Sequence, residues 1–236
     1  MPANRFEVVN LPGGKQMPLN EKAKLPSSGI DFVNAIKPRL ELLPPGRVLD
    51  IGAGYYGIIG SAFAQLGWEV TLLEKNPDAC EHLQQSFPYK CRVLNEDIRT
   101  TTIPDSYFDC IVSNPAQMPA QSDDEQWDHD VAGMSGFDMM EYVIHSAHQA
   151  LTEDGILLIL VFGFHLTAVK ECAQEQGLIL KNQYRMLKRC SANGHILSSL
   201  KRLRQLYLAF NWDDVSDKHV LPTSIVELSR GERQNA

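Results

Sequence analysis

Short blocks of apolar residues recur along this chain and alternate between two spacings. Runs of about five apolar positions, as before Gly52, are typical of buried strands, whereas apolar residues three and four apart, as from Ile30 to Leu40, are typical of helices. Glycines such as Gly67 and Gly177 close several of the blocks. The pattern predicts helices over residues 28–40, 57–66, 77–86, 137–151, 166–176 and 195–210, and strands over residues 47–51, 69–73, 91–94, 108–113, 155–162, 178–187 and 224–228.

Alternating strands and helices predict an α/β fold with a parallel sheet and right-handed crossovers. Residues 1–28 are rich in Pro, Gly, Asn and Lys and lack a clear period, so we expect an irregular arm there. Ligands of parallel sheets bind beyond the carboxyl ends of the strands. The predicted ligand site therefore consists of residues 52–54, Glu74, Asp97, Asn114 and residues 163–165.

The composition limits the class of protein. With 236 residues, of which 44% are hydrophobic, the chain is long enough for one large α/β domain. The apolar run 156–164 is far shorter than the roughly 20 residues of a membrane-spanning helix, and the first residues lack the pattern of a signal peptide. The five cysteines form no C-x-x-C pair, which disfavours disulfides and metal binding. We expect a cytoplasmic protein that binds no metal and no membrane.

Charge is distributed unevenly along the chain. The formal net charge of −7 argues against a general nucleic-acid binder, and residues 100–169 contain no Lys or Arg. Residues 177–212, in contrast, contain seven Lys and Arg and no acid. This basic segment is either a solvated helix face or a surface for an anionic substrate, such as a carboxylate or a phosphate.

The sequence Asp50-Ile-Gly-Ala-Gly-Tyr-Tyr-Gly57 contains a G-x-G-x-x-G pattern, and Glu74 follows 22 residues after Gly52. A glycine turn and a later acid are typical of proteins that bind NAD, but other adenosine ligands use the same features. Asp50 is unusual for a dinucleotide-binding strand, in which an apolar residue normally precedes the turn by two positions. An acid there can hydrogen-bond the glycine loop and so shape it.

With Asp50, Gly52 and Gly54, the chain resembles the class I, Rossmann-like S-adenosylmethionine-dependent methyltransferases, whose first motif is an acid, any residue and G-x-G. The resemblance implies that Glu74 binds both ribose hydroxyls and that Asp97 accepts a hydrogen bond from the adenine amino group. It also implies a three-layer sandwich with a seven-stranded, mostly parallel sheet and a last antiparallel strand. The cofactor residues that we expect are Asp50, Gly52, Ala53, Gly54, Tyr55, Glu74, Lys75, Asp97, Ile98 and Asn114.

The stretch "NPAQMP" resembles the N-P-P-(aromatic) motif of amino-methyltransferases that modify glutamine side chains or nucleobase amino groups. In those enzymes the Asn side chain and a following carbonyl accept hydrogen bonds from the target nitrogen, and the aromatic ring stacks on its planar group. Asn114 and Pro115 match this motif, whereas Ala116 and Gln117 replace the second Pro and the aromatic residue. The acceptor role of Asn114 is thus retained, and the stacking role is not.

Asn114, Tyr56 and His129 are the predicted catalytic residues. Tyr56 stands where a third glycine often lies, and either reaches the methionine end of the donor or packs beneath the first helix. His129 is either a base steered by the neighbouring Asp128 and Asp130 or an exposed loop residue. Trp127, as an aromatic platform, and His165, at a strand end, are further candidates.

The resemblance implies methyl transfer from S-adenosyl-L-methionine, with S-adenosyl-L-homocysteine as product, to a nitrogen of a small molecule or of a peptide or protein side chain. We expect an arm or cap over residues 1–28 and a methyltransferase domain over residues 29–236, with a basic helical insertion at about 190–220. Three alternatives remain, and one is that another alkyl group of the donor is transferred or cyclised. An NAD-type oxidoreductase explains the glycines and Glu74 but not Asp50 or Asp97, and a non-catalytic donor-binding module would explain Gln117.

Overall fold

The computed structural model describes residues 8–23, 27–120, 131–190 and 195–231. The chain forms two compact units. The first comprises residues 1–114 with residues 150–156, and the second comprises residues 115–149 with residues 157–236.

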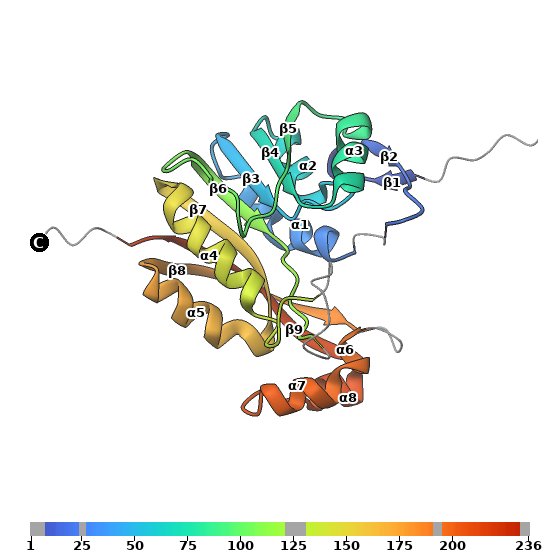
Figure 1. Ribbon diagram of the computed structural model, residues 1–236, viewed down its shortest axis with the longest axis vertical. Coiled ribbons are helices and arrows are strands. Elements are labelled where there is room, and N and C mark those ends of the chain that lie inside the picture. The colour runs from blue at the N-terminus through green and yellow to red at the C-terminus, as the bar shows by residue number, and fades with distance from the viewer. Residues whose placement is uncertain (1–7, 24–26, 121–130, 191–194, 232–236) are drawn as a thin grey trace, which may run out of the picture. The chain divides into compact units, whose positions relative to one another are not determined.

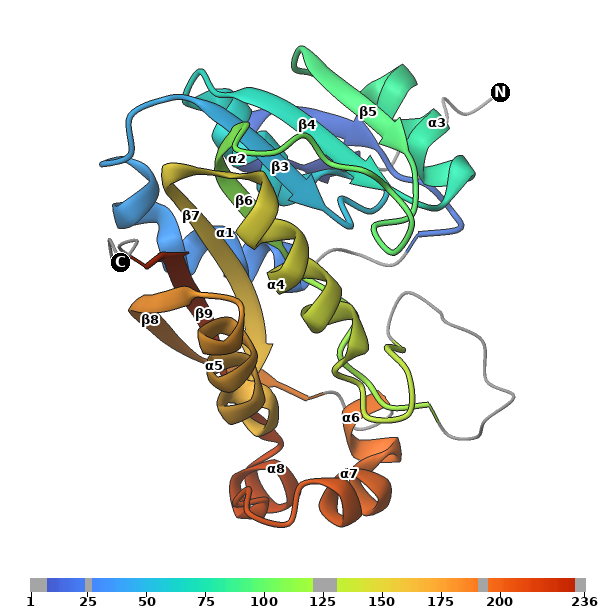
Figure 2. The same ribbon diagram turned by 60° about the vertical axis from the view of Figure 1, so that its left-hand side comes forward.

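The first unit alternates parallel strands with helices. Strand β3 pairs in parallel with β4 on one side, where Val48 faces Val70, and with β6 on the other, where Val48 faces Cys110. Figure 2 shows β3, β4 and β5 running side by side. The elements of this core are α1 (Ser27–Leu40), β3 (Arg47–Ile51), α2 (Ile58–Gln65), β4 (Glu69–Glu74), α3 (Pro77–Ser86), β5 (Cys91–Asn95) and β6 (Phe108–Ser113).

The N-terminal arm packs on this core rather than extending from it. Strands β1 (Val8–Asn10) and β2 (Gln16–Pro18) form a hairpin around the short helix η1 (Pro12–Gly14), and the hairpin lies beside α3 in Figure 1. The side chain of Met17 is completely buried. The arm is therefore anchored by apolar contacts of its own.

The second unit contains a long antiparallel hairpin, in which β8 and β9 pair from Leu178 with Arg230 to Arg189 with Val220. A register shift between Leu180 and Asn182 marks an irregularity in β8. In the described part of the connection between the two strands, three short helices are found. The elements are α4 (Asp138–Ala150), β7 (Leu151–Phe162), η2 (Gly163–His165), α5 (Leu166–Glu175), β8 (Leu178–Arg189), α6 (His195–Ser198), α7 (Leu200–Leu206), α8 (Asp213–Lys218) and β9 (Val220–Arg230).

Among the described residues, seven strands form one sheet in the order β5-β4-β3-β6-β7-β9-β8. The predicted Rossmann-like sandwich with a seven-stranded, mostly parallel sheet and a last antiparallel strand is confirmed. No helix in the described ranges has the length and apolar character needed to cross a membrane.

Three predicted elements differ clearly from the structure, and one of them is β9, which begins at Val220 rather than at residue 224. Strand β7 begins at Leu151, not at residue 155, and includes the polar residues Thr152, Glu153 and Asp154, which lie outside the apolar run that predicted the strand. The predicted helix 195–210 is divided into α6 and α7, and α8 follows. Helix α7 ends at Leu206, and Tyr207 then leaves the helical conformation while its hydroxyl hydrogen-bonds the carbonyl of Ser135.

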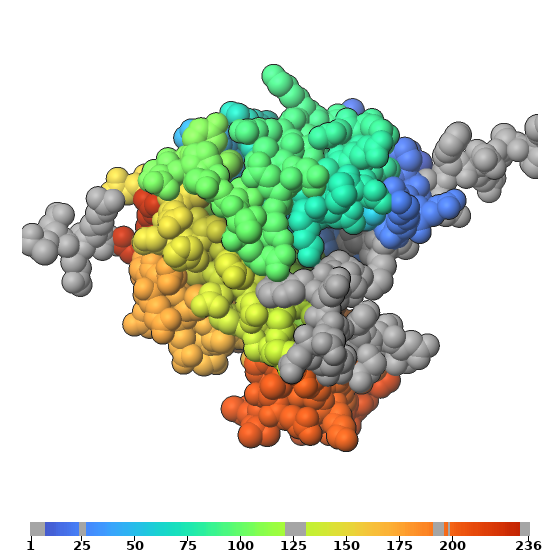
Figure 3. All heavy atoms as spheres, viewed as in Figure 1, coloured from blue at the N-terminus to red at the C-terminus, as the bar shows by residue number. Residues whose placement is uncertain are grey.

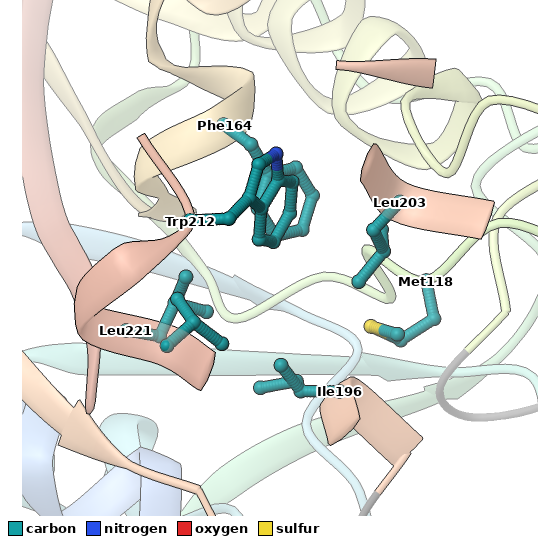
Figure 4. Packing of buried hydrophobic residues seen from close by; sticks show 7 residues of the cluster. Met118, Phe164, Ile196, Leu203, Trp212 and Leu221 are labelled. Atoms are coloured by element: carbon teal, nitrogen blue, oxygen red, sulfur yellow. The ribbon is translucent and has the colours of Figure 1, made fainter. Parts of the chain in front are cut away.

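A separate apolar cluster holds these helices on the second unit. In Figure 4, the rings of Phe164 and Trp212 overlap, with centroids 5.5 Å apart and planes 29° from parallel. Met118 and Leu203 also belong to the cluster. The space-filling view in Figure 3 shows the residues of α7 and α8 (dark orange) as one continuous group of atoms. Helices α6, α7 and α8 thus pack against the end of β7 and against Met118. Met118 lies four positions after Asn114 in the sequence.

Candidate functional site

Two glycines shape the turn after β3. The backbone N–H groups of Gly52 and Ala53 donate to the carbonyl of Leu73 at 2.8 and 3.2 Å, which fixes the turn on β4. Gly52 and Gly54 have φ values of 76° and 63°, in the left-handed region that side chains disfavour. A Cβ atom on either would meet nothing within 4 Å among the described residues, so a ligand has room to approach this backbone closely.

Asp50 precedes the glycine turn but contacts the helix that follows it. Its buried carboxylate accepts the backbone N–H of Gly60, in the first turn of α2, at 2.8 Å. Burial raises the pKa of Asp50 to about 7, and this hydrogen bond opposes the rise. Gly57 is the residue before α2 and has a φ of 52°, so the third glycine of the pattern has a backbone role of its own.

Glu74 ends β4 and joins the glycine turn to the start of α3. Its Oε2 accepts the N–H of Gly54 at 2.9 Å, and its Oε1 accepts the N–H of Asn76 at 2.8 Å. Each carboxylate oxygen has a second lone pair, so two ribose hydroxyls can still bind. Asn76 caps α3 by accepting the N–H of Asp78 at 2.9 Å.

The structure places Asp97 shortly after β5 and orients its carboxylate through Arg99. The guanidinium of Arg99 contacts both carboxylate oxygens, and its Nη2 lies 2.5 Å from Oδ2. This hydrogen bond lowers the pKa of Asp97, and the more distant Lys75 adds to the effect. Asp97 is half-buried and remains charged, while Ile98 beside it is buried. The acid suits an amino-group donor, such as the one that the resemblance implies.

The two tyrosines of the loop lie in different environments. Tyr55 is half-buried, whereas Tyr56 is 2% exposed. The hydroxyl of Tyr56 accepts the backbone N–H of Asn20 at 3.0 Å, and its ring meets His82 edge-on with centroids 5.7 Å apart. This geometry supports packing against the arm, and a catalytic role for Tyr56 stays a prediction that kinetics must test.

Asn114 follows β6 directly and is half-buried. Its side chain makes no hydrogen bond within the part of the chain that the structure describes. The preceding residue is fixed, because the Ser113 hydroxyl donates to the carbonyl of Ile51 at 2.8 Å. Asn114 therefore offers an amide at the carboxyl end of a central strand. The candidates Trp127 and His129 lie outside the described residues.

Gln117 and His165 are buried in the second unit. The Gln117 side chain hydrogen-bonds Leu160 and Phe162 of β7, and its carbonyl lies 3.0 Å from His165 Nε2. His165 is completely buried, and burial lowers its pKa to about 4. Its Nδ1 lies 3.1 Å from the Tyr207 hydroxyl. Because His165 is completely buried and its Nε2 is used on a main-chain carbonyl, it is part of the packing rather than an exposed base.

Sequence reasoning missed Tyr207 and Asn20. Nothing in the pattern around Tyr207 indicates a buried hydroxyl, and Asn20 acts through its backbone, which carries no residue-specific signal. Gln117, in contrast, could be noticed from the sequence, because it stands in place of the aromatic residue of the N-P-P-(aromatic) motif.

Comparison with known proteins identifies the family of this chain. Residues 32–177, more than half of the chain, match the family model described as methyltransferase small domain. A relative from Flavobacterium johnsoniae, a tRNA1(Val) adenine-N6-methyltransferase, is 28% identical over 210 residues, which are 79% of this chain and 83% of that protein.

Solved methyltransferases share the fold. A TehB-like S-adenosylmethionine-dependent methyltransferase from Corynebacterium glutamicum has a TM-score of 0.52 and 18% identity, over 87% of this chain and all of that one. A 16S rRNA N2 methyltransferase from T. thermophilus, in complex with AdoMet and guanosine, has a TM-score of 0.56 and 16% identity, over 96% of this chain and 50% of that one.

Proposed function

We propose that this chain, which belongs to the methyltransferase small domain family and is an S-adenosylmethionine-dependent methyltransferase, transfers the methyl group to a nitrogen atom. The observation that carries the proposal is the side chain of Asn114. It stands at the end of β6, half-buried, with no hydrogen-bond partner among the described residues. An amide oxygen so placed can accept a hydrogen bond from an N–H group and thereby aim the nitrogen lone pair.

The donor residues that we propose lie on successive strand ends of the first unit. The glycine turn after β3 would hold the methionine end, Glu74 the ribose hydroxyls, and Asp97 the adenine amino group. The sulfonium of the donor is itself a good electrophile, so the protein mainly aligns the acceptor and excludes water. A neutral amine needs no base, whereas a hydroxyl would need one.

The acceptor that we propose is an amine or amide of a small molecule or of a peptide or protein side chain. In the resembling motif a ring stacks on a flat acceptor, but here Gln117 holds that position and its amide is hydrogen-bonded to Leu160 and Phe162. Gln117 thus offers no stacking surface. An acceptor that is bound chiefly through hydrogen bonds fits this arrangement better than one that is bound by stacking.

The test is a panel of acceptors with S-adenosylhomocysteine release as the readout. The panel contains glutamine- and lysine-containing peptides, spermidine, and unmodified tRNA and rRNA transcripts. We expect turnover of a peptide or amine, its loss in Asn114→Ala, and binding of S-adenosylhomocysteine that is kept in this variant. Gln85→Ala removes an exposed amide from α3 and is the matched control. Methylation on oxygen or carbon, or full turnover by Asn114→Ala, would overturn the proposal.

RNA is the second candidate acceptor. The relative from F. johnsoniae methylates a tRNA adenine, and Lys181, Arg185 and Arg189 of β8 are exposed. Arg185 and Arg189 follow the irregularity in β8 at an even spacing, which places them on one face, and Lys181 lies at the irregularity itself. All three could contact phosphates. If RNA is the acceptor, reversing these three charges should weaken tRNA binding and reduce its salt dependence, whereas Lys37→Glu should change neither. Equal salt dependence in both variants would argue against this candidate.

A further inference from the structure

We infer that Gln117 is a positioning residue for methyl transfer, because its amide fixes the path of the chain directly after Asn114. The inference rests on the proposed function, since Gln117 acts on the reaction only through Asn114. In place of the ring of the resembling motif, this chain has a side chain that is built into the second unit. The contacts that carry the inference come from β7, η2 and the end of α7.

The amide of Gln117 takes the place of a strand residue beside β7. Its Nε2 donates to the carbonyl of Leu160 at 3.1 Å, and its Oε1 accepts the N–H of Phe162 at 2.8 Å. A residue of a parallel strand would use its peptide N–H and C=O on the same two groups, which flank Val161. The Gln117 side chain is 2% exposed, so water does not compete for either bond.

The main chain of Gln117 is held as well. A carbonyl can only accept, so His165 donates from Nε2 to the Gln117 oxygen. The Tyr207 hydroxyl lies 3.1 Å from the other nitrogen of the same ring and also bonds the carbonyl of Ser135. Gln117 is thus joined, through its side chain and its main chain, to β7, η2 and the end of α7.

Backbone contacts fix the residues that follow Gln117. The carbonyl of Met118 accepts the N–H of Ala132 at 2.9 Å, and the N–H of Ala120 donates to the carbonyl of Gly133 at 2.8 Å. A Cβ atom on Gly136 would lie 2.6 Å from the Gln117 carbonyl oxygen, so only glycine allows the two backbones to come this close. The segment after Gln117 therefore has little freedom to move.

Asn114, in contrast, has no side-chain hydrogen bond within the described residues to hold its amide. Between Asn114 and Gln117 stand only Pro115, whose ring restricts φ, and Ala116. An anchor at Gln117 therefore limits the directions in which the chain can leave Asn114. Misplacement of an acceptor by about 1 Å can cost on the order of 100-fold in rate, so this restriction bears on turnover.

The first test replaces Gln117 with Leu, which removes both side-chain hydrogen bonds and keeps an apolar side chain. With the acceptor that the panel identifies, we expect kcat to fall at least about tenfold, because a misdirected Asn114 misaligns the acceptor. The dissociation constant of S-adenosylhomocysteine, measured by calorimetry, should stay within about twofold. Thr223→Val removes a different buried side-chain hydrogen bond of the second unit, from the Thr223 hydroxyl to the carbonyl of Leu221. This variant controls for lost stability and should keep its kcat. An unchanged kcat in Gln117→Leu would overturn the inference.

The second test measures the kcat of Gln117→Glu as a function of pH. It decides on the role of Gln117 even if Gln117→Leu does not fold. A protonated carboxyl can donate to Leu160 and accept from Phe162, as the amide does, whereas a carboxylate cannot donate. Burial keeps such a carboxyl protonated to a higher pH than usual. The kcat of Gln117→Glu relative to the natural protein should therefore fall as pH rises from about 5.5 to about 8.5.

The groups that face Gln117 do not titrate in this range. Burial lowers the pKa of His165 to about 4 and raises the pKa of Tyr207. A ratio of kcat values that is constant with pH would contradict the positioning role. If Asn114→Ala retains turnover, the proposed function fails. If Asn114→Ala loses turnover while Gln117→Leu keeps its kcat, only the role of Gln117 fails.

Discussion

The carboxylate of Glu74 accepts a hydrogen bond from the backbone N–H of Gly54 at 2.9 Å. The residue that we expect to bind the ribose therefore also holds the glycine turn. Hydrogen bonds to charged groups contribute about 1.5–3 kcal/mol. We expect Glu74→Ala to weaken S-adenosylhomocysteine binding by roughly 10- to 100-fold in calorimetry. Glu69→Gln, at the exposed opposite end of β4, should bind as the natural protein does. Equal affinities for Glu74→Ala and Glu69→Gln would remove Glu74 from the donor site.

Asp50 should make stability depend on pH. Its folded pKa of about 7 lies above the ordinary aspartate value of 3.8, so between these values the folded state holds a proton that the unfolded chain has lost. Stability from this group therefore falls as pH rises through that window, by at most about 1.4 kcal/mol per pH unit. Asp50→Asn does not titrate and can still accept the N–H of Gly60.

Urea unfolding at several pH values measures this effect. The advantage of Asp50→Asn over the natural protein should grow between about pH 4 and about pH 7, because other titrating groups contribute equally to both proteins. An advantage that stays constant over this range would show that Asp50 keeps an ordinary pKa in the folded state.

Tyr56→Phe tests whether this residue takes part in the reaction. The substitution keeps the ring against His82 and removes the hydroxyl that accepts the N–H of Asn20. We expect a loss of about 1 kcal/mol in the free energy of unfolding and a kcat within about twofold of the natural value. A large loss of kcat at unchanged stability would restore Tyr56 to the catalytic residues.

Gly57→Ala should destabilise the protein in two ways. The φ of 52° disfavours a side chain by roughly 1–2 kcal/mol, and the new Cβ atom would lie 2.9 Å from Phe87 Cε2. Phe87→Leu gives the methyl group more room, so Gly57→Ala should cost less in that background. Urea unfolding of the four proteins in this double-mutant cycle measures the difference. Equal costs in both backgrounds would mean that Phe87 does not crowd residue 57.

The alternation of strands and helices and the turns after β3 and β4 could be predicted because they depend on local sequence. Gly52 and Gly54 are needed for the backbone itself, and Asn76 and Pro77 begin α3 where such residues usually do. The pattern also separated β8 from β9 correctly. Features of this kind are specified within a few residues along the chain.

The orientations of Tyr56 and Gln117 could not be predicted, because distant residues determine them. The direction of Tyr56 depends on Asn20, 36 residues earlier, and the amide of Gln117 pairs with β7 residues more than 40 positions later. The motif indicated that residue 117 had lost an aromatic ring. It could not indicate that an amide would serve as a substitute strand.

The N-terminal arm has a consequence for how the protein is made. Asn20 reaches Tyr56, Lys22 reaches Asp78, and Pro12 accepts the hydroxyl of Tyr89, at sequence separations of 36, 56 and 77 residues. A ribosome synthesises the arm long before these partners. The hairpin can therefore dock completely only after Tyr89 has emerged, and its apolar Val9 and Met17 stay accessible to chaperones during that interval.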